Sequence, residues 1–164
     1  MKRLLLLDAD VIIDLHTLDL FEKIAKAYDM YVPRTVFHEA RYFKKSGHRE
    51  KINIADKVTV VDVAPEDLNL VRIEASEAQR GIDPGELEAI AYLNTAEEDL
   101  LFCTCDKAAI TLVSYMELED KSASVEKIVK GAGQHTKKLF PRHLDRMFKE
   151  CVREGKALRI QFKL

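Results

Sequence analysis

Short apolar runs alternate with helical patterns along most of the chain, and this alternation limits the folds that it can adopt. The runs predict strands at 3–8, 30–33, 58–63 and 100–104. Helical patterns lie between and after them, at 11–27, 35–43, 65–80, 83–96 and 106–116. Strands separated by helices form a parallel sheet that is covered on both faces. The sequence therefore predicts a three-layer α/β/α fold with a central, mostly parallel sheet of four to five strands.

Size and composition favour a single compact domain without a membrane segment. The chain has 164 residues, and 47% of them are hydrophobic, which argues against wholesale disorder. The longest leucine run, 4–7, is much shorter than the about 20 apolar residues of a membrane span. Three cysteines are too few and too unevenly placed for a disulfide framework. We expect a reduced, cytoplasmic protein with no membrane contact.

The formal net charge of −2 is the average of two strongly charged segments. Residues 62–120 carry 15 acids and 3 bases, whereas residues 121–164 carry 12 bases and 4 acids. Residues 34–51 are also basic, with 6 bases and 2 acids. Such segregation is a signature of interaction surfaces, so the near-neutral total does not exclude nucleic acid.

The last part of the chain is patterned differently, which predicts a main domain over 1–133 and an extension over 134–164. A helix beginning at Pro141 has apolar residues at helical spacing. Its opposite face is cationic and could contact RNA phosphates or simply be solvated: Arg142, Arg146, Lys149 and Arg153. Alternating apolar residues then predict a one-sided strand at 157–163. We expect this extension to pack on the same domain or on a dimer partner.

Four acids stand near the carboxyl ends of predicted strands or early in the helices: Asp8, Glu39, Glu88 and Asp106. Carboxylates that meet at one sheet edge repel one another unless a cation lies between them, and oxygen ligands suit Mg²⁺ or Mn²⁺. Asp8 could also be a simple strand-end residue, with Asp10 as the cap of the following helix. Asp106 could also be a helix cap, and exposed helix surface could explain Glu39. A capping box that starts at Asp83 explains Glu86 but not Glu88.

The sequence resembles a PIN-domain ribonuclease of the VapC-like toxin kind over residues 1–118. The resemblance rests on Leu-Leu-Leu-Asp8-Ala-Asp10, Val36-x-x-Glu39-Ala, Gly85-Glu86-Leu-Glu88-Ala-Ile and Leu101-Phe-Cys-Thr104-Cys-Asp106. It implies a parallel sheet of about five strands and an endoribonuclease that uses Mg²⁺ or Mn²⁺ and a metal-bound water. It also implies a homodimer and inhibition by a small antitoxin protein encoded alongside.

The resemblance assigns roles to individual residues. Asp8, Glu39, Glu88 and Asp106 match the family's catalytic and metal-binding acids. Three further residues are auxiliary candidates: Asp10, which could add a ligand or cap a helix, Glu86, and Thr104, which matches the position that supports the last acid. The family's short hydrophobic fifth strand has no evident counterpart after Met116.

Two other functions remain open on the residues alone. Leu-Leu-Leu-Leu-Asp8-Ala-Asp10-Val also resembles the nucleophile motif of haloacid-dehalogenase-like phosphatases, in which Asp8 would form an aspartyl-phosphate. No later strand ends in paired acids, which weighs against that interpretation. A catalytically idle RNA- or partner-binding module of the same fold is the other alternative, because fold does not determine function.

Overall fold

The computed structural model describes residues 2–164 and contains one central sheet whose strands all run parallel. Within these residues the sheet has five strands in the order β5-β2-β1-β6-β7. The strands are β1 (Arg3–Leu7), β2 (Tyr28–Pro33), β5 (Val58–Val61), β6 (Leu100–Cys103) and β7 (Ser122–Ala123). The predicted α/β class and parallel sheet are confirmed, and β7 supplies the fifth strand that the sequence left in doubt.

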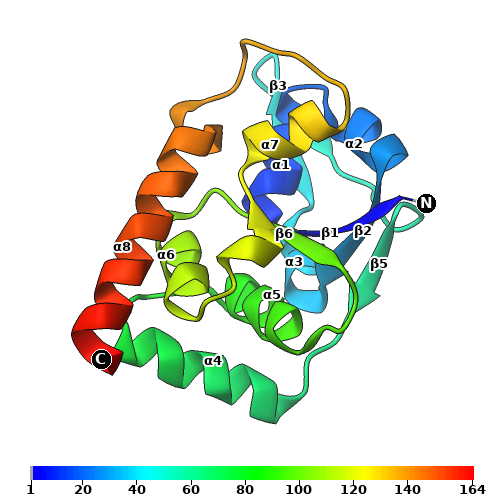
Figure 1. The fold of residues 1–164 in the computed structure, drawn as a ribbon. Helices are drawn as coiled ribbons and strands as arrows, with labels where there is room; N and C mark the ends of the chain where they lie inside the picture. The colour runs from blue at the N-terminus through cyan, green and yellow to red at the C-terminus, as the bar shows by residue number, and fades with distance from the viewer. Residues whose placement is uncertain (1) are drawn as a thin grey trace.

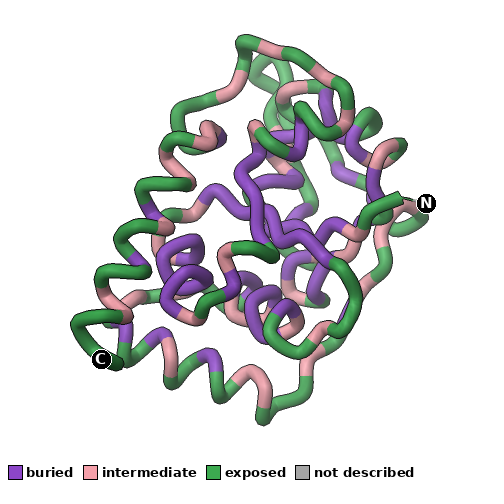
Figure 2. The backbone as a smooth tube through the Cα atoms, in the orientation of Figure 1, coloured by how far each residue is buried: buried purple, intermediate pink, exposed green. Residues whose placement is uncertain are grey.

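Helices cover both faces of this sheet (Figure 1). They are α1 (Ala9–Thr17), α2 (Phe21–Ala27), α3 (Arg34–Glu39), α4 (Pro65–Glu77), α5 (Pro84–Thr95), α6 (Lys107–Tyr115), α7 (Val125–Gly131) and α8 (Asp145–Lys163). Leu5 and Leu7 pack with α1, α2 and α7 in one core cluster, whereas Leu6 faces α4, α5 and α6 in the other. The period-two alternation of a strand therefore divides one leucine run between two cores. Figure 2 shows the buried backbone concentrated along the sheet and the inner helices.

The predicted strand at 157–163 is wrong, because these residues continue the long helix α8. Helix α8 lies along α6, as Figure 1 shows, so the extension packs on its own domain. The apparent alternation reflects a helix end in which Leu158 packs on the second core cluster, while Ile160 and Leu164 are exposed. The polar residues of this helix end form ion pairs with acids of the main domain. One example is Lys163, whose Nζ lies 2.6 Å from Glu74 Oε2.

Two other predicted elements differ from the structure. The helix expected at 11–27 is divided into α1 and α2, because Asp19 takes a left-handed backbone conformation with φ of 55°. The helix expected to run to residue 43 ends at Glu39. The chain then forms an antiparallel hairpin of β3 (Tyr42–Lys45) and β4 (His48–Lys51), for which the sequence predicted no strands. Ser46 and Gly47 turn the hairpin with positive φ values of 50° and 79°, as a two-residue type I′ turn requires.

The topology places the ends of β1 and β6 side by side at the carboxyl edge of the sheet. The chain proceeds from β1 to β2 on one side, while β6 lies on the other, and this reversal of strand order is where parallel α/β proteins bind ligands. The N–H of Asp8 donates to the carbonyl of Cys103 at 3.3 Å, which holds the two strand ends together. No helix among residues 2–164 is both long and apolar enough to cross a membrane.

Candidate functional site

Asp8 and Asp106 follow the carboxyl ends of β1 and β6, and the hydroxyl of one threonine forms hydrogen bonds with both residues. The Thr104 hydroxyl donates to Asp8 Oδ2 at 3.2 Å and accepts the N–H of Asp106 at 3.2 Å. Asp8 Oδ1 accepts from the N–H of Ala9 at 2.7 Å, and Asp106 Oδ1 from the N–H of Ala109 at 2.8 Å. Each acid therefore caps a helix and also faces the junction of the two strands.

Glu86 belongs to the same centre, although it comes from α5. Its side chain is only 5% exposed, as Asp8 is at 4%. Burial raises the pKa of Glu86 to about 9, and the negative charges of Asp8 and Asp106 add to the effect. Burial likewise raises the pKa of Asp8 to about 7, with the charges of Asp10 and Asp106 acting in the same direction. Asp8, Glu86 and Asp106 are called the acidic centre below.

Three further acids surround the acidic centre. Partial desolvation is the largest cause of the raised pKa of Asp10, and the negative charges of Asp14, Asp106 and Asp83 raise it further. Partial desolvation is also the largest cause of the raised pKa of Glu39, and the negative charges of Asp83 and Asp10 raise it further. A Cβ at Gly85 would lie 3.4 Å from Glu39 Oε2, so the end of α3 approaches the start of α5. Asp83 makes no side-chain bond to the N-terminus of α5, although it precedes that helix.

Glu88 is held at a different place. Its Oε1 accepts from the hydroxyl of Thr35 at 2.8 Å, and its Oε2 from the N–H of Thr35 at 3.1 Å. Residues 86 and 88 are two positions apart on a helix and do not share a face. The structure therefore brings Asp8, Asp106 and Glu86 together, with Glu39 and Asp10 at the rim, while Glu88 joins α5 to α3.

The donor set of the acidic centre is made of carboxylate oxygens, which are the ligands of Mg²⁺ and Mn²⁺. No trio of its ligand atoms lies within 4.8 Å of one another among the described residues. As these acids lie, at most two of them could bind one ion directly, and Mg²⁺ is commonly bound by one or two carboxylates with several waters. The residues of the centre thus fit a hydrated divalent ion better than a fully protein-ligated one.

A second polar cluster, next to the acidic centre, joins α1 to the extension. Asp14 accepts two bonds from the Arg142 guanidinium, at 2.9 and 3.0 Å, and its Oδ2 lies 2.7 Å from His143 Nε2. His143 Nδ1 accepts from the N–H of Phe140 at 3.1 Å, so Nε2 carries the proton that it donates to Asp14. Burial would raise the pKa of Asp14, but the bonds from His143 and Arg142 outweigh it and lower that pKa.

This cluster also contains the side chain of Cys105. Ligand atoms of Asp14, Cys105 and His143 lie within 4.8 Å of one another, a spacing compatible with a metal ion. However, burial raises the pKa of Cys105 to about 12, which disfavours the thiolate that a metal requires. The Arg142 guanidinium already occupies both oxygens of Asp14. We interpret the cluster as a structural clamp between α1 and the extension.

The cationic residues predicted on the extension have separate environments. Arg142 and Arg146 line a pocket of about 440 Å³ with Lys107, the residue that follows Asp106. Lys149 pairs with Asp145 one turn earlier, at 2.9 Å. Arg153 lies exposed farther along α8. Of the four, Arg142 and Arg146 thus share a pocket with Lys107, the sequence neighbour of Asp106.

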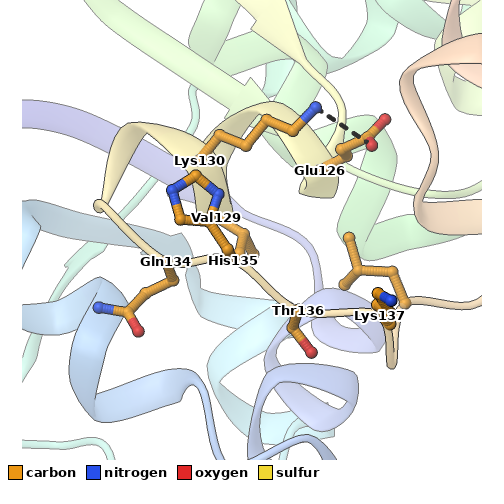
Figure 3. A pocket seen from close by; sticks show the side chains of 8 residues that line it. Glu126, Val129, Lys130, Gln134, His135, Thr136 and Lys137 are labelled. Carbon is orange, nitrogen blue, oxygen red and sulfur yellow. Dashed lines mark ion pairs between the residues drawn. The ribbon is translucent and has the colours of Figure 1, made fainter.

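Another cavity, of about 250 Å³, lies between α7 and the loop that follows it (Figure 3). An ion pair of Lys130 Nζ and Glu126 Oε2, 3.4 Å apart, lies at its wall. Polar side chains such as Gln134 and His135 complete it. None of the acids in or around the acidic centre lines this cavity.

Two members of the site were not assigned a central role from the sequence. Glu86 was predicted only as an auxiliary residue because helix capping explains it, and Asp83 was explained by the same motif. The signal that could have distinguished Glu86 is its position in the first turn of an otherwise apolar helix face, beside the buried Gly85 and Ala89.

No protein-family model matches this chain, and no curated protein matches it.

Proposed function

We propose that the protein is a Mg²⁺- or Mn²⁺-dependent endoribonuclease of the PIN-domain, VapC-like kind, and that it is the toxin of a toxin–antitoxin pair. One observation carries this proposal: two nearly buried carboxyl groups, Asp8 and Glu86, both have pKa values raised by burial and by the charge of Asp106. None of the groups that perturb them most is a cation. Buried acids without a countercharge destabilise a fold, and a divalent ion would offset that cost.

One or two of Asp8, Glu86 and Asp106 would hold the ion directly and the rest through its waters, with Asp10 and Glu39 within the same electrostatic neighbourhood. The ion would activate a water for attack on a phosphodiester and stabilise charge on the leaving oxygen. Glu39 and Glu88 remain candidates from the family resemblance. Between the two glutamates of α5, the raised pKa and burial of Glu86 favour it as the ligand.

The residues of the chain would act mainly by positioning. Thr104 orients Asp8 and Asp106 together, and backbone N–H groups of α1 and α6 fix one oxygen of each acid. Each bonded oxygen keeps a second lone pair for a ligand. In the metal-free protein, Glu86 holds a proton at neutral pH, and this proton would leave when a cation binds.

The pocket of Lys107, Arg142 and Arg146 supports RNA as the substrate. Cations at hydrogen-bonding distance of a polynucleotide supply salt-dependent affinity for its phosphates. Arg142 is oriented by Asp14, and its guanidinium lies 4.7 Å from the ring centre of Phe140. Lys149 and Arg153 would add weaker contacts farther along α8.

The proposed partners and location follow from the family resemblance. That resemblance supports a small antitoxin protein as a partner and a homodimer as the assembly. A cytoplasmic location agrees with three buried cysteines that form no disulfide among the described residues. Light scattering of the purified chain measures the oligomeric state directly.

Cleavage of RNA by the purified protein with Mg²⁺ or Mn²⁺, and not with EDTA, tests the proposal. Asp8→Asn and Asp106→Asn should each lower the rate at least about 100-fold, because each removes a charged ligand of the ion. Glu98→Gln, which alters an exposed acid outside the centre, is the matched control and should retain the wild-type rate.

Undiminished cleavage in both aspartate variants would contradict the proposed site. Absence of cleavage with either ion and any RNA would favour the idle-module alternative. Labelling of Asp8 by an acyl-phosphate mimic would instead support the phosphatase alternative, because only that reaction passes through an aspartyl-phosphate.

A further inference from the structure

The hairpin of β3 and β4 projects from the main fold without joining the central sheet. A two-stranded ribbon is marginally stable alone, so it needs anchors on the domain. Phe43 supplies one, since it packs on the first core cluster and its ring centre lies 5.5 Å from that of His16 on α1. The buried Ile52 supplies another, and its N–H donates to the carbonyl of Arg41 at 2.7 Å. The hairpin is thus held in one place, with most of its side chains in solvent.

Its charge is not explained by the stability of the fold. Residues 41–51 carry five bases and one acid. In the described chain, the one ion pair that the hairpin makes is a long one, between Lys45 Nζ and Asp19 Oδ1 at 3.9 Å. Like charges this close destabilise a hairpin, so their concentration indicates an anionic ligand.

Between the hairpin and α1 lies a pocket of about 430 Å³, within the about 300–1,000 Å³ typical of small-molecule sites. Its lining combines apolar, aromatic and cationic groups: Ile13, Thr17, Tyr42, Phe43, Lys44 and Arg49. The Arg49 guanidinium lies 3.9 Å from the centre of the Tyr42 ring, and Tyr42 is 42% exposed. Stacked aromatic and guanidinium groups are the platform on which unpaired nucleobases bind, and nearby lysines take the phosphates.

Helix α1 connects the pocket with the acidic centre. Helix α1 begins directly after Asp8 and contributes Ile13 and Thr17 to the pocket. At 1.5 Å per residue, Asp10 and Thr17 are about 10 Å apart along the helix axis. The hairpin also begins three residues after Glu39. A strand bound at the acidic centre could therefore reach the pocket within a few nucleotides.

We propose that the pocket between the β3–β4 hairpin and α1 binds an unpaired nucleotide of the RNA substrate, its base stacked on Tyr42 and Arg49 and its phosphate beside Lys44. The proposal rests on the proposed ribonuclease function. It makes single-stranded RNA, rather than duplex RNA, the substrate class, because a base inside a duplex cannot stack on a side chain.

Binding of a short labelled single-stranded RNA to the full chain in EDTA tests this without any cleavage. Tyr42→Ala and Arg49→Gln should each weaken binding about tenfold, the equivalent of about 1.4 kcal/mol and within the range for one stacked base. Lys44→Gln should reduce the salt slope by about 0.7, the value for one phosphate of a single strand. Tyr42→Phe should bind as the wild type does, since it keeps the aromatic ring.

Arg72→Gln is the charge-matched control, because Arg72 is an exposed cation on α4 away from the hairpin. It should bind RNA as the wild type does. Tyr42→Ala and the wild type should bind duplex RNA with equal affinity. Circular dichroism and thermal unfolding show whether each variant keeps the fold, and Arg49→Gln carries the test if Tyr42→Ala does not fold.

Single-stranded RNA binding within twofold of the wild type in both Tyr42→Ala and Arg49→Gln would overturn the proposal. Equal losses for polyglutamate and RNA would also overturn it, since they would indicate a surface for an acidic protein. If the wild type cleaves RNA but these variants bind normally, the hairpin proposal alone fails. If no cleavage is found but binding falls as expected, the nuclease function fails and the pocket stands.

Discussion

At the scale of single residues, the environment of each acid distinguishes positions that look equivalent in the sequence. Glu86 and Glu88 are two residues apart in the same motif. Glu86 is almost completely buried beside Asp8 and Asp106, whereas Glu88 bonds to Thr35 of α3. Helix geometry separates them, because side chains two positions apart point in different directions.

We therefore expect Glu86→Gln to abolish most RNA cleavage, with a loss of about 100-fold or more, because it removes a charged ligand. Glu88→Gln should lower cleavage less than about tenfold, since it loosens one contact between α3 and α5. Initial rates with Mn²⁺ measure both variants. A larger loss in Glu88→Gln than in Glu86→Gln would contradict this assignment.

The raised pKa values of Glu86 and Asp8 predict how stability depends on pH without metal. The native state releases the Glu86 proton at its pKa of about 9, whereas the unfolded chain releases it at about pH 4.3. Between these values the unfolded state binds fewer protons, so the free energy of unfolding falls as pH rises. Asp8, with a pKa of about 7, adds to the fall at its lower end.

Urea unfolding in EDTA at about pH 5, 7 and 9 measures this fall. Glu86→Gln should flatten the profile and be more stable than the wild type at about pH 8 by about 1 kcal/mol or more, the equivalent of one pKa unit. Mg²⁺ or Mn²⁺ should restore stability to the wild type at that pH but not to Glu86→Gln. A profile that rises between about pH 5 and 8 would contradict the burial of these acids.

At the scale of elements, the long helix α8 depends on one glycine for its contact with α6. A Cβ at Gly155 would clash with the carbonyl of Thr111 and lie 2.6 Å from Ser114 Cβ. The Ser114 hydroxyl also donates to the carbonyl of Val152 at 2.6 Å across the same contact. The two helices therefore approach too closely for any larger residue.

Gly155→Ala should lower the free energy of unfolding by about 1–3 kcal/mol, because the helices must separate to admit a methyl group. Gly81→Ala is the matched control, since nothing lies within 4 Å of its position and its φ is not positive. That variant should be neutral or slightly more stable. Equal stability of Gly155→Ala and the wild type would show that α8 does not dock as described.

The elements also show which local signals were sufficient. The apolar run at 4–7 and the motif at 83–86 each produced the predicted element, because a buried parallel strand and a helix start with proline in its first turn are specified locally. The hairpin was missed because Tyr42–Lys45 does not alternate apolar and polar residues. The strand at 157–163 was wrong because its alternation was not tied to a partner strand, and docking on α6 favours a helix.

At the scale of the whole molecule, the charged segments of the chain pair with each other. Lys156, Arg159 and Lys163 of α8 make ion pairs with Glu119, Glu117 and Glu74 of the acidic segment. Much of the basic charge of residues 121–164 thus faces acids of the same chain. The cations left near the acidic centre are those at its edge, such as Lys107 and Arg146.

The clamp of Asp14 with Arg142 and His143 holds the extension beside the acidic centre. Asp14→Asn should lower the free energy of unfolding by about 1.5–3 kcal/mol at neutral pH, the range for charged hydrogen bonds. Because folding lowers the pKa of Asp14, this stabilisation exists above about pH 4 and is lost as pH falls through the native pKa.

Urea unfolding at neutral and acidic pH measures the effect of Asp14→Asn, with Asp56→Asn, an exposed turn residue, as the control. The difference between Asp14→Asn and the wild type should shrink at acidic pH. A constant difference, or none at neutral pH, would contradict the clamp.

The sequence by itself determined the parallel sheet, its two helical layers and the acids at its carboxyl edge, because period, capping and strand-end position are local properties. Only the tertiary structure decided which acids meet. Strand order brings Asp8 beside Thr104 and Asp106, and the packing of α5 on β6 buries Glu86 among them while Glu88 turns to α3. It also decided that the basic extension is a helix clamped to its own domain, since that outcome depends on a glycine contact and on charges more than 100 residues apart.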